Sequence, residues 1–139
     1  MLEIPIENIM SDHPIKIKEN IRIGSVAHLL LRHQISGILV VKKDNENKLV
    51  GILTTTDLLR LVNQALSQKK QKIKALKKIS GLKAGDVASK RVISLQKDDK
   101  VMKAIAIMHR KNVHTIPIFD GQKVIGVIGK HDVLNVALL

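Results

Sequence analysis

The sequence predicts a mixed α/β (α+β) protein made of two tandem copies of one strand–helix–strand–strand–helix (βαββα) repeat. Residues 49–59, with the sequence LVGILTTTDLL, return 75 positions later as residues 124–134, VIGVIGKHDVL. Residues 35–41 align in the same way with residues 113–119, 78 positions further along. Repetition at this period indicates two supersecondary units in one chain, and the predicted elements follow the same order in both.

Each repeat begins with a short strand and an amphipathic helix. The predicted strands are residues 14–17 and 92–95. Apolar helical faces at i, i+3, i+4 and i+7 spacing follow them, formed by Val26, Leu29, Leu30 and His33 and by Val101, Ala104, Ile105 and Met108. Asp98 and Asp99 suit the N-terminus of the second of these helices.

Each repeat then continues with a hairpin and a closing helix. These are predicted at residues 37–41, 48–53 and 57–66, and again at residues 115–119, 123–128 and 131–138. The polar residues 42–47 separate the first pair of strands as a loop. Asp120-Gly121 supplies the chemistry of a tight turn in the second hairpin.

A basic segment joins the two repeats. We predict the first repeat at residues 1–66, a helical linker at residues 67–81 and the second repeat at residues 82–139. No helix breaker occurs between residues 68 and 78, so the sequence allows the first closing helix to run on until Ser80-Gly81 stops it. Seven lysines gather in the linker and directly after it: Lys69, Lys70, Lys72, Lys74, Lys77, Lys78 and Lys83.

Composition excludes several classes of protein. The 139 residues are 45% hydrophobic and 26% charged, as in a globular domain, and the absence of cysteine rules out disulfides, iron–sulfur clusters and thiolate zinc sites. No apolar run approaches the roughly 20 residues needed to span a bilayer, and the N-terminus shows no signal-peptide pattern, so we expect a cytoplasmic protein without a membrane span. The common catalytic motifs are missing and the six histidines do not pair with carboxylates at metal spacing, so we expect no catalysis, no metal site and no required cofactor.

The net charge of +12 favours an anionic partner. Either the lysine-rich linker binds nucleic acid or an acidic protein, or it is a solvated helix face. Phe119 is the only aromatic residue, so bases cannot stack on a row of aromatic side chains, which disfavours nucleic acid.

Both closing helices are apolar around more than one face, at residues 58–62 and 133–139. Two interpretations are open: the helices lie deep between the sheets, or they form a subunit interface. Because excess apolar surface on terminal helices is typical of subunit contacts, we expect a homodimer.

The repeated motif ends in an aspartate at the start of a helix. Thr54 as N-cap with Asp57 three residues later fits a capping box. The same geometry suits a ligand, because exposed N–H groups and a hydroxyl bind phosphate while a carboxylate accepts the hydroxyls of a ribose. Asp132 repeats Asp57, but Gly129 stands in place of Thr54 and removes one hydroxyl.

Over nearly its whole length the chain resembles a tandem pair of CBS domains, the family named after cystathionine β-synthase. Residues 8–11 ahead of Pro14, the strands at 36–41 and 114–118 and the two Gly-to-Asp segments carry the likeness. The resemblance implies two βαββα motifs about a pseudo-twofold axis, acting as a non-catalytic, energy-sensing regulatory module. It also implies clefts between the motifs for AMP, ADP, ATP, S-adenosylmethionine or NAD, with AMP or ATP favoured, and a regulated enzyme or transporter on another chain.

The resemblance also implies a role for individual residues in two clefts. The first would contain Asp57 for the ribose, Thr54 and Thr56 for the phosphate, and Val92, Val113, His114 and Thr115 from the opposite motif. The second would contain Asp132, Lys130 and His131, faced by Pro14, Ile15, Ile35, Ser36 and Gly37. For His114 a phosphate contact and a half-buried strand histidine remain alternative interpretations.

Overall fold

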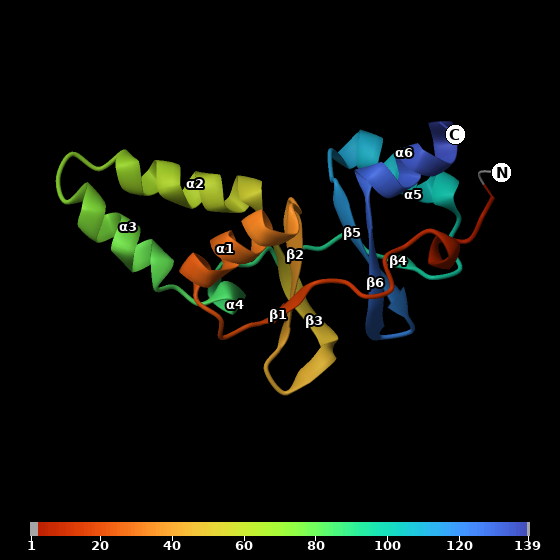
Figure 1. The fold of residues 1–139 in the computed structure, drawn as a ribbon, viewed down its shortest axis with the longest axis horizontal. Coiled ribbons are helices and arrows are strands. Elements are labelled where there is room, and N and C mark those ends of the chain that lie inside the picture. The colour runs from red at the N-terminus through yellow and green to blue at the C-terminus, as the bar shows by residue number, and fades with distance from the viewer. Residues whose placement is uncertain (1–2, 139) are drawn as a thin grey trace. The chain divides into compact units, whose positions relative to one another are not determined.

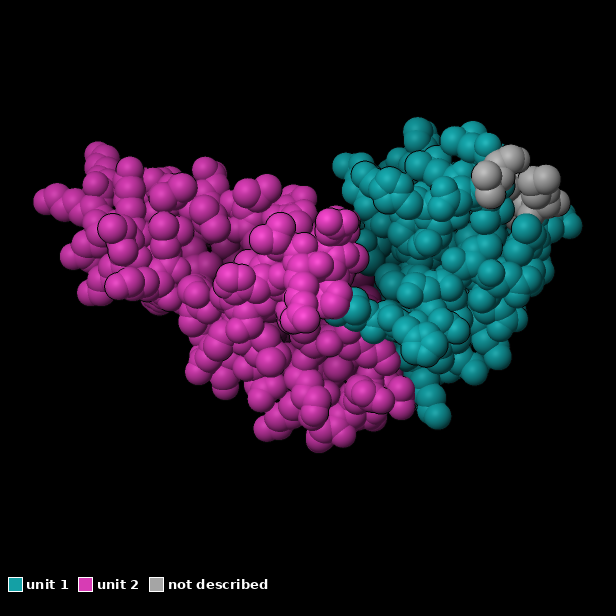
Figure 2. Space-filling view, viewed as in Figure 1, with its two compact units in different colours: residues 1–15, 92–139 teal, residues 16–91 magenta. Residues whose placement is uncertain are grey.

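The computed structural model describes residues 3–138, so residues 1, 2 and 139 of the predicted repeats lie outside the described part. The chain forms two compact units: unit 1 contains residues 1–15 and 92–139, and unit 2 contains residues 16–91 (Figure 2). Each unit is a three-stranded sheet with helices (Figure 1), as the predicted mixed α/β fold requires.

Unit 2 is built around a sheet with the strand order β1-β2-β3. Its elements are β1 (Lys16–Lys18), α1 (Ile23–His33), β2 (Gly37–Lys42), β3 (Asn45–Thr54), α2 (Thr55–Leu66), α3 (Lys72–Ser80) and α4 (Ala84–Val87). Strand β1 runs parallel to β2, and β2 runs antiparallel to β3. Helix α1 supplies the crossover connection that a parallel pair of strands needs.

Unit 1 repeats this plan with the strand order β4-β5-β6. Its elements are η1 (Ile6–Asn8), β4 (Leu95–Gln96), α5 (Val101–Lys111), β5 (Thr115–Asp120), β6 (Lys123–Gly129) and α6 (Lys130–Leu138). Strand β4 is parallel to β5, and β5 is antiparallel to β6. The same order of parallel and antiparallel pairs in both units confirms the duplication.

The crossover helices bury the apolar faces that the sequence predicts. On α1, Val26 and Leu30 are buried, whereas His33 at the end of the predicted face is exposed. On α5 the buried positions are Val101, Ala104 and Met108. Both helices end at a residue in the left-handed region, Gln34 at φ 52° and Asn112 at φ 53°. Equivalent caps therefore stop the two crossover helices.

The short first strands differ from the prediction. Pairing starts only at Lys16 in β1 and at Leu95 in β4, so most of the predicted 92–95 strand is irregular. Asp99 does not cap α5, because Lys100 is the N-cap residue. The carboxylate of Asp99 instead accepts a hydrogen bond from the Gln96 backbone N–H at 2.8 Å and closes the turn ahead of the helix.

The hairpins are tighter than the predicted loop at residues 42–47 implies. Strands β2 and β3 pair as far as Lys42 and Asn45, so the polar residues prolong an exposed hairpin instead of forming a loop. The second hairpin turns at Gly121, whose φ of 64° is the left-handed conformation that glycine adopts without steric cost.

Helix α2 does not run on into the linker. It ends at Leu66, the Ser67 hydroxyl donates to the Gln64 carbonyl at 2.7 Å, and Gln71 turns the chain at φ 60° before α3 begins. The predicted stop at Ser80-Gly81 is confirmed, because Gly81 is the C-cap of α3.

The first residues of each repeat belong to the unit that the other repeat builds: those up to residue 15 lie in unit 1, and residues 82–91 lie in unit 2. In unit 1, Ser11 and Val127 exchange backbone hydrogen bonds of 2.9 and 3.1 Å. In unit 2, Ser89 and Ile52 exchange bonds of 2.9 and 3.1 Å at the equivalent positions. The compact units therefore differ from the repeats in sequence by a reciprocal exchange of their leading segments.

This exchange explains the duplicated glycines. A Cβ atom on Gly51 would collide with the Ser89 carbonyl oxygen, and a Cβ atom on Gly126 would lie 2.7 Å from the Ser11 carbonyl oxygen. Only glycine at these positions leaves room for Ser89 to pair with Ile52 and for Ser11 to pair with Val127.

The closing helices expose part of their apolar surface. Leu59 on α2 is 68% exposed, and Leu134, the equivalent residue on α6, is 47% exposed. Deep burial of the whole helix between sheets is therefore the wrong interpretation for these positions. Within residues 3–138, no helix combines the length and the apolarity needed to cross a membrane.

Candidate functional site

The strand-to-helix junction of unit 2 forms the centre of the candidate site, here called the Asp57 turn (residues 54–57). Strand β3 ends at Thr54, which has extended dihedral angles of φ −117° and ψ 164°, and α2 begins at the next residue. The Asp57 backbone N–H donates to the Thr54 hydroxyl oxygen at 3.2 Å, and the Thr54 backbone N–H donates to Oδ2 of Asp57 at 2.9 Å. The predicted capping box is confirmed.

The capping box leaves part of each side chain available. The Thr54 hydroxyl accepts one hydrogen bond but keeps its own proton, which remains free to donate. Oδ1 of Asp57 lies 3.4 Å from the Arg60 guanidinium, and that is its only hydrogen bond or ion pair with a described residue. The Asp57 side chain is 20% exposed. The carboxylate therefore keeps lone pairs that solvent, or a hydroxyl donor, can reach.

The start of β2 lies beside the Asp57 turn. The Thr55 backbone N–H donates to the Ser36 carbonyl at 2.9 Å, and Gly37 is the register partner of Thr54. Ser36 and Thr56 are both exposed. Unit 2 thus gathers six of the predicted site residues at one end of its hairpin: Ile35, Ser36, Gly37, Thr54, Thr56 and Asp57.

Unit 1 contains an equivalent junction, the Asp132 turn (residues 129–132). The Gly129 backbone N–H donates to Oδ2 of Asp132 at 2.7 Å, and the Lys130 N–H donates to the His114 carbonyl at 3.2 Å. Thr115 is the register partner of Gly129. Because residue 129 has no side chain, Asp132 makes only half of the capping box.

The remaining predicted site residues also lie in unit 1. Pro14, Ile15, Val92 and Val113 are half-buried, and His114, Lys130 and His131 are exposed. Exposure of His114 favours a surface role over the half-buried interpretation. The predicted groupings of Asp57 with His114, and of Asp132 with Ser36, combine residues of different units and stay predictions.

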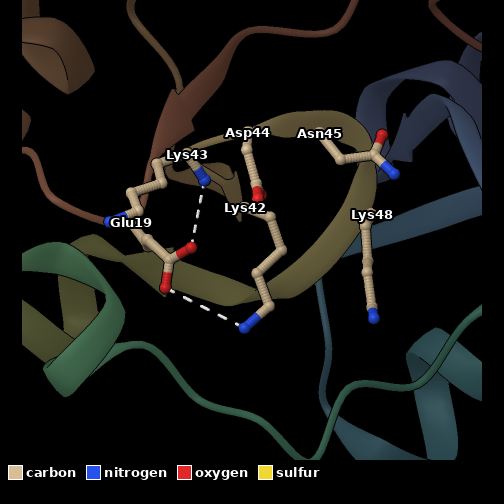
Figure 3. Close-up of a pocket in the computed structure, with 6 residues that line it drawn as sticks. All are labelled: Glu19, Lys42, Lys43, Asp44, Asn45 and Lys48. Carbon is tan, nitrogen blue, oxygen red and sulfur yellow. Dashed lines mark hydrogen bonds and ion pairs between the residues drawn. The ribbon is translucent and has the colours of Figure 1, made fainter.

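Sequence reasoning did not find a polar pocket at the tip of the first hairpin (Figure 3). It has a volume of about 580 Å³ and is lined by Glu19, Lys42, Lys43, Asp44, Asn45 and Lys48. The Glu19 carboxylate accepts from the Lys43 backbone N–H at 3.0 Å and pairs with the Lys42 ammonium at 4.0 Å, as Figure 3 shows. The charged residues 42–44 are the sequence feature that indicates this pocket. A hairpin, unlike the predicted loop, brings Lys42 and Lys43 to the Glu19 carboxylate.

The pocket differs from the two turns in chemistry. Its acidic and basic groups partly neutralise one another, and no predicted site residue lines it. Among residues 3–138, no cluster of three or more His, Asp or Glu side chains could hold a metal ion. The Asp57 turn, with its partly free hydroxyl and carboxylate at a helix N-terminus, is the better candidate for binding a phosphorylated sugar.

Comparison with known proteins identifies relatives of the whole chain. A homoserine O-acetyltransferase of Methanococcus vannielii is 32% identical over 131 residues, which cover 94% of this chain but only 24% of the relative. The chain thus spans about a quarter of the length of this curated relative.

Solved structures of other proteins match the fold of nearly the whole chain. The CBS domain pair of protein MJ0100, solved in complex with 5′-methylthioadenosine and S-adenosyl-L-methionine, matches with a TM-score of 0.73 and 25% identity, covering 96% of this chain and 99% of the other. CBSX2, solved in complex with AMP, matches with a TM-score of 0.76 and 21% identity, covering 96% of each chain.

The family model described as CBS domain matches the chain twice, at residues 6–64 and at residues 84–139. The two matches coincide with the two copies of the repeated motif. Each contains one of the two aspartates, Asp57 and Asp132, that accept a backbone N–H at the start of a helix. The chain belongs to the CBS domain family, of which it contains a tandem pair.

Proposed function

We propose that this chain is a non-catalytic regulatory module that senses an adenosine-containing ligand through the Asp57 turn. The observation that carries the proposal is Oδ1 of Asp57, which only Arg60 contacts among the described residues, next to the Thr54 hydroxyl at the start of α2. A carboxylate and a helix N-terminus at this spacing suit the two ends of a nucleoside phosphate, since one accepts hydroxyl protons and the other attracts anions.

Each atom of the turn has a specific role in the proposal. Oδ1 of Asp57 accepts a ribose hydroxyl, sharing its lone pairs with Arg60. The hydroxyl protons of Thr54 and of the exposed Thr56 donate to phosphate oxygens. The base packs against aliphatic side chains, because the chain offers one aromatic residue only.

The family supports an adenosine compound over other nucleotides. The CBS domain pair of MJ0100 is solved with 5′-methylthioadenosine and S-adenosyl-L-methionine, and its fold matches this chain over 96% of the length. CBSX2, with the same fold, is solved with AMP. We propose AMP or ATP for this chain, and S-adenosylmethionine and NAD are the compounds to compare.

We propose unequal binding by the two halves of the chain. The Asp132 turn has no threonine hydroxyl, so phosphate loses one donor there unless Lys130 replaces it. For the Asp57 turn we propose that His114 contributes a phosphate contact from unit 1, and His114→Ala tests that contribution separately from the turn itself.

The proposed output is a change in another protein. A ligand shifts a conformational equilibrium only by its different affinity for two arrangements, and the regulated enzyme or transporter would lie on another chain. The exposed leucines Leu59 and Leu134 occupy equivalent positions on α2 and α6, which supports a homodimer as the form that responds.

The expected affinity is moderate. A hydrogen bond to a charged group contributes about 1.5–3 kcal/mol, and association costs at least about 4 kcal/mol. Micromolar binding corresponds to about −8 kcal/mol, so several such bonds and the packing of the base together must exceed that cost, and we expect micromolar dissociation constants for AMP.

A thermal-shift panel tests the proposal. The unfolding temperature is measured with a reporter dye, since the chain contains no tryptophan or tyrosine, in the presence of AMP, ATP, S-adenosylmethionine, NAD and, as a control base, GMP. We expect a concentration-dependent rise for at least one adenosine compound and a smaller rise for GMP. Equal, negligible shifts with all five would contradict the proposal.

A further inference from the structure

Helices α2 and α3 pack against each other as an antiparallel helical arm of unit 2, with their connecting loop farthest from the sheet (Figure 1). Hydrogen bonds join the end of α3 to the start of α1. The Ile23 backbone N–H donates to the Leu82 carbonyl at 2.9 Å, and the Arg22 guanidinium donates to the Gly81 carbonyl at 2.5 Å. The arm therefore presents its outer surface from a fixed base.

The outer surface of α3 is a row of lysines. Lys74, Lys77 and Lys78 follow i, i+3 and i+4 spacing, which puts them on one helix face, opposite the partly buried Leu76 and Ile79. All seven lysines between residues 69 and 83 are exposed, and none makes an ion pair or side-chain hydrogen bond with any residue from 3 to 138.

No acidic residue lies near them in the sequence. From residue 58 to residue 85 the chain contains no Asp or Glu. Like charges at i, i+4 spacing destabilise a helix, and Lys74 and Lys78 stand in that relation without a compensating acid. An anionic surface laid against α3 would remove this repulsion.

The end of the arm adds apolar side chains to the charge. Leu66 ends α2 and is 45% exposed, and Ile73 in the first turn of α3 is 73% exposed. Between them the loop carries Lys69 and Lys70, both exposed. Aliphatic side chains flanked by lysines are typical of segments that rest at a lipid interface, where the aliphatic groups enter the acyl boundary and the ammonium groups meet the headgroups.

We propose that the α2–α3 arm docks this protein on an anionic lipid surface. On the lysine-bearing surface of α3 and the connecting loop, charge complementarity favours this occupant over a second copy of the chain, which carries the same positive charge. Nucleic acid would also attract the lysines, but its phosphates make no contact that requires the exposed Leu66 and Ile73. The arm contains a single arginine, Arg60, which pairs with Asp57, and no aromatic side chain on which bases could stack.

Vesicle binding by the full chain tests the proposal. Co-sedimentation is measured with phosphatidylcholine vesicles and with vesicles in which part of the phosphatidylcholine is replaced by phosphatidylserine. We expect binding to the anionic vesicles alone, weakening as salt is added. A lysine close to such a surface contributes a factor of about five, so the triple variant Lys74→Glu, Lys77→Glu, Lys78→Glu should bind at least about 100-fold more weakly.

A charge-matched control separates the arm from the net charge. The variant Lys90→Glu, Lys111→Glu, Lys123→Glu changes three exposed lysines outside the arm and gives the same net charge. We expect it to keep most of the vesicle binding. Equal loss in both triple variants would overturn the proposal, since attraction would then come from the overall charge.

Ile73→Gln distinguishes lipid from nucleic acid. The residue is exposed, so the fold should not change, and circular dichroism checks this. We expect several-fold weaker binding to anionic vesicles and unchanged binding to duplex DNA. Vesicle binding that does not respond to Ile73→Gln, together with tighter binding to duplex DNA than to vesicles, would assign the arm to nucleic acid and overturn the lipid proposal.

Discussion

Thr54 and Asp57 satisfy each other's backbone N–H groups across the first turn of α2, at 2.9 and 3.2 Å. This reciprocal bonding uses one carboxylate oxygen and leaves the other facing Arg60 at 3.4 Å. One pair of residues thus starts the helix and keeps an acceptor for a ligand, so capping and binding are compatible functions of the same side chains.

Removing the Thr54 hydroxyl should destabilise the protein even without ligand. Thr54→Val keeps the shape of the side chain but leaves the Asp57 N–H without its partner, and we expect the free energy of unfolding to fall by about 0.5–2 kcal/mol. Thr55→Val, at the exposed first position of α2, is the matched control and should change it by less than about 0.5 kcal/mol. Urea unfolding followed by circular dichroism measures both, and equal effects would contradict the capping role.

Adding the missing hydroxyl should give the Asp132 turn the complete capping box that the Asp57 turn has. A Cβ atom at Gly129 would lie 3.6 Å from Oδ2 of Asp132, which is ordinary contact, so there is room for the Cβ of Gly129→Thr, and we expect its hydroxyl to complete the box. Because glycine is already a tolerable N-cap, we expect a gain of only a few tenths of a kcal/mol in stability. We also expect tighter AMP binding at this turn.

Gly129→Val is the control for that change, since it adds the same bulk without a hydroxyl. Calorimetric titration with AMP compares the two variants. We expect tighter AMP binding for the threonine variant only. An equal gain with valine would show that bulk, and not the hydroxyl, is responsible.

Much of this site could be predicted from the sequence because its determinants are local. Thr54 and Asp57 are three residues apart, and capping chemistry depends on just that spacing. The predicted loop at residues 42–47 is wrong because polarity does not distinguish a loop from an exposed hairpin, and these residues form a hairpin. The exchange of leading segments was missed because the pairing of Ser89 with Ile52 joins residues far apart in sequence, which local patterns do not report.

The repeated glycines of β3 and β6 should tolerate no side chain. In Gly51→Ala the new methyl group would meet the Ser89 carbonyl and disrupt its pairing with Ile52, so we expect a loss of about 1–3 kcal/mol. Gly129→Ala, where the nearest atom is 3.6 Å from the added Cβ, is the control and should cost less than about 1 kcal/mol. Chemical unfolding curves compare the two, and a smaller loss for Gly51→Ala than for its control would refute the close-approach explanation.

The exchange of leading segments predicts which fragment folds. Residues 16–91 contain a complete unit, with α4 and the Ser89 pairing, in one continuous stretch. Residues 1–66 contain the first repeat but lack the segment that pairs beside Gly51. We expect a cooperative thermal transition, followed by circular dichroism, for the 16–91 fragment and none for the 1–66 fragment. Cooperative unfolding of residues 1–66 at the same temperature would contradict this explanation.

We propose that the carboxylate of Asp57 holds the ligand, and calorimetric titration of AMP into Asp57→Ala and Asp132→Ala separates this role from helix capping. Each aspartate caps a helix by accepting an N–H from the residue three positions earlier, so both variants should lose about 0.5–2 kcal/mol of stability. We expect micromolar AMP binding by the unaltered chain, retained binding by Asp132→Ala and no measurable heat with Asp57→Ala. Unchanged AMP affinity in Asp57→Ala would contradict it.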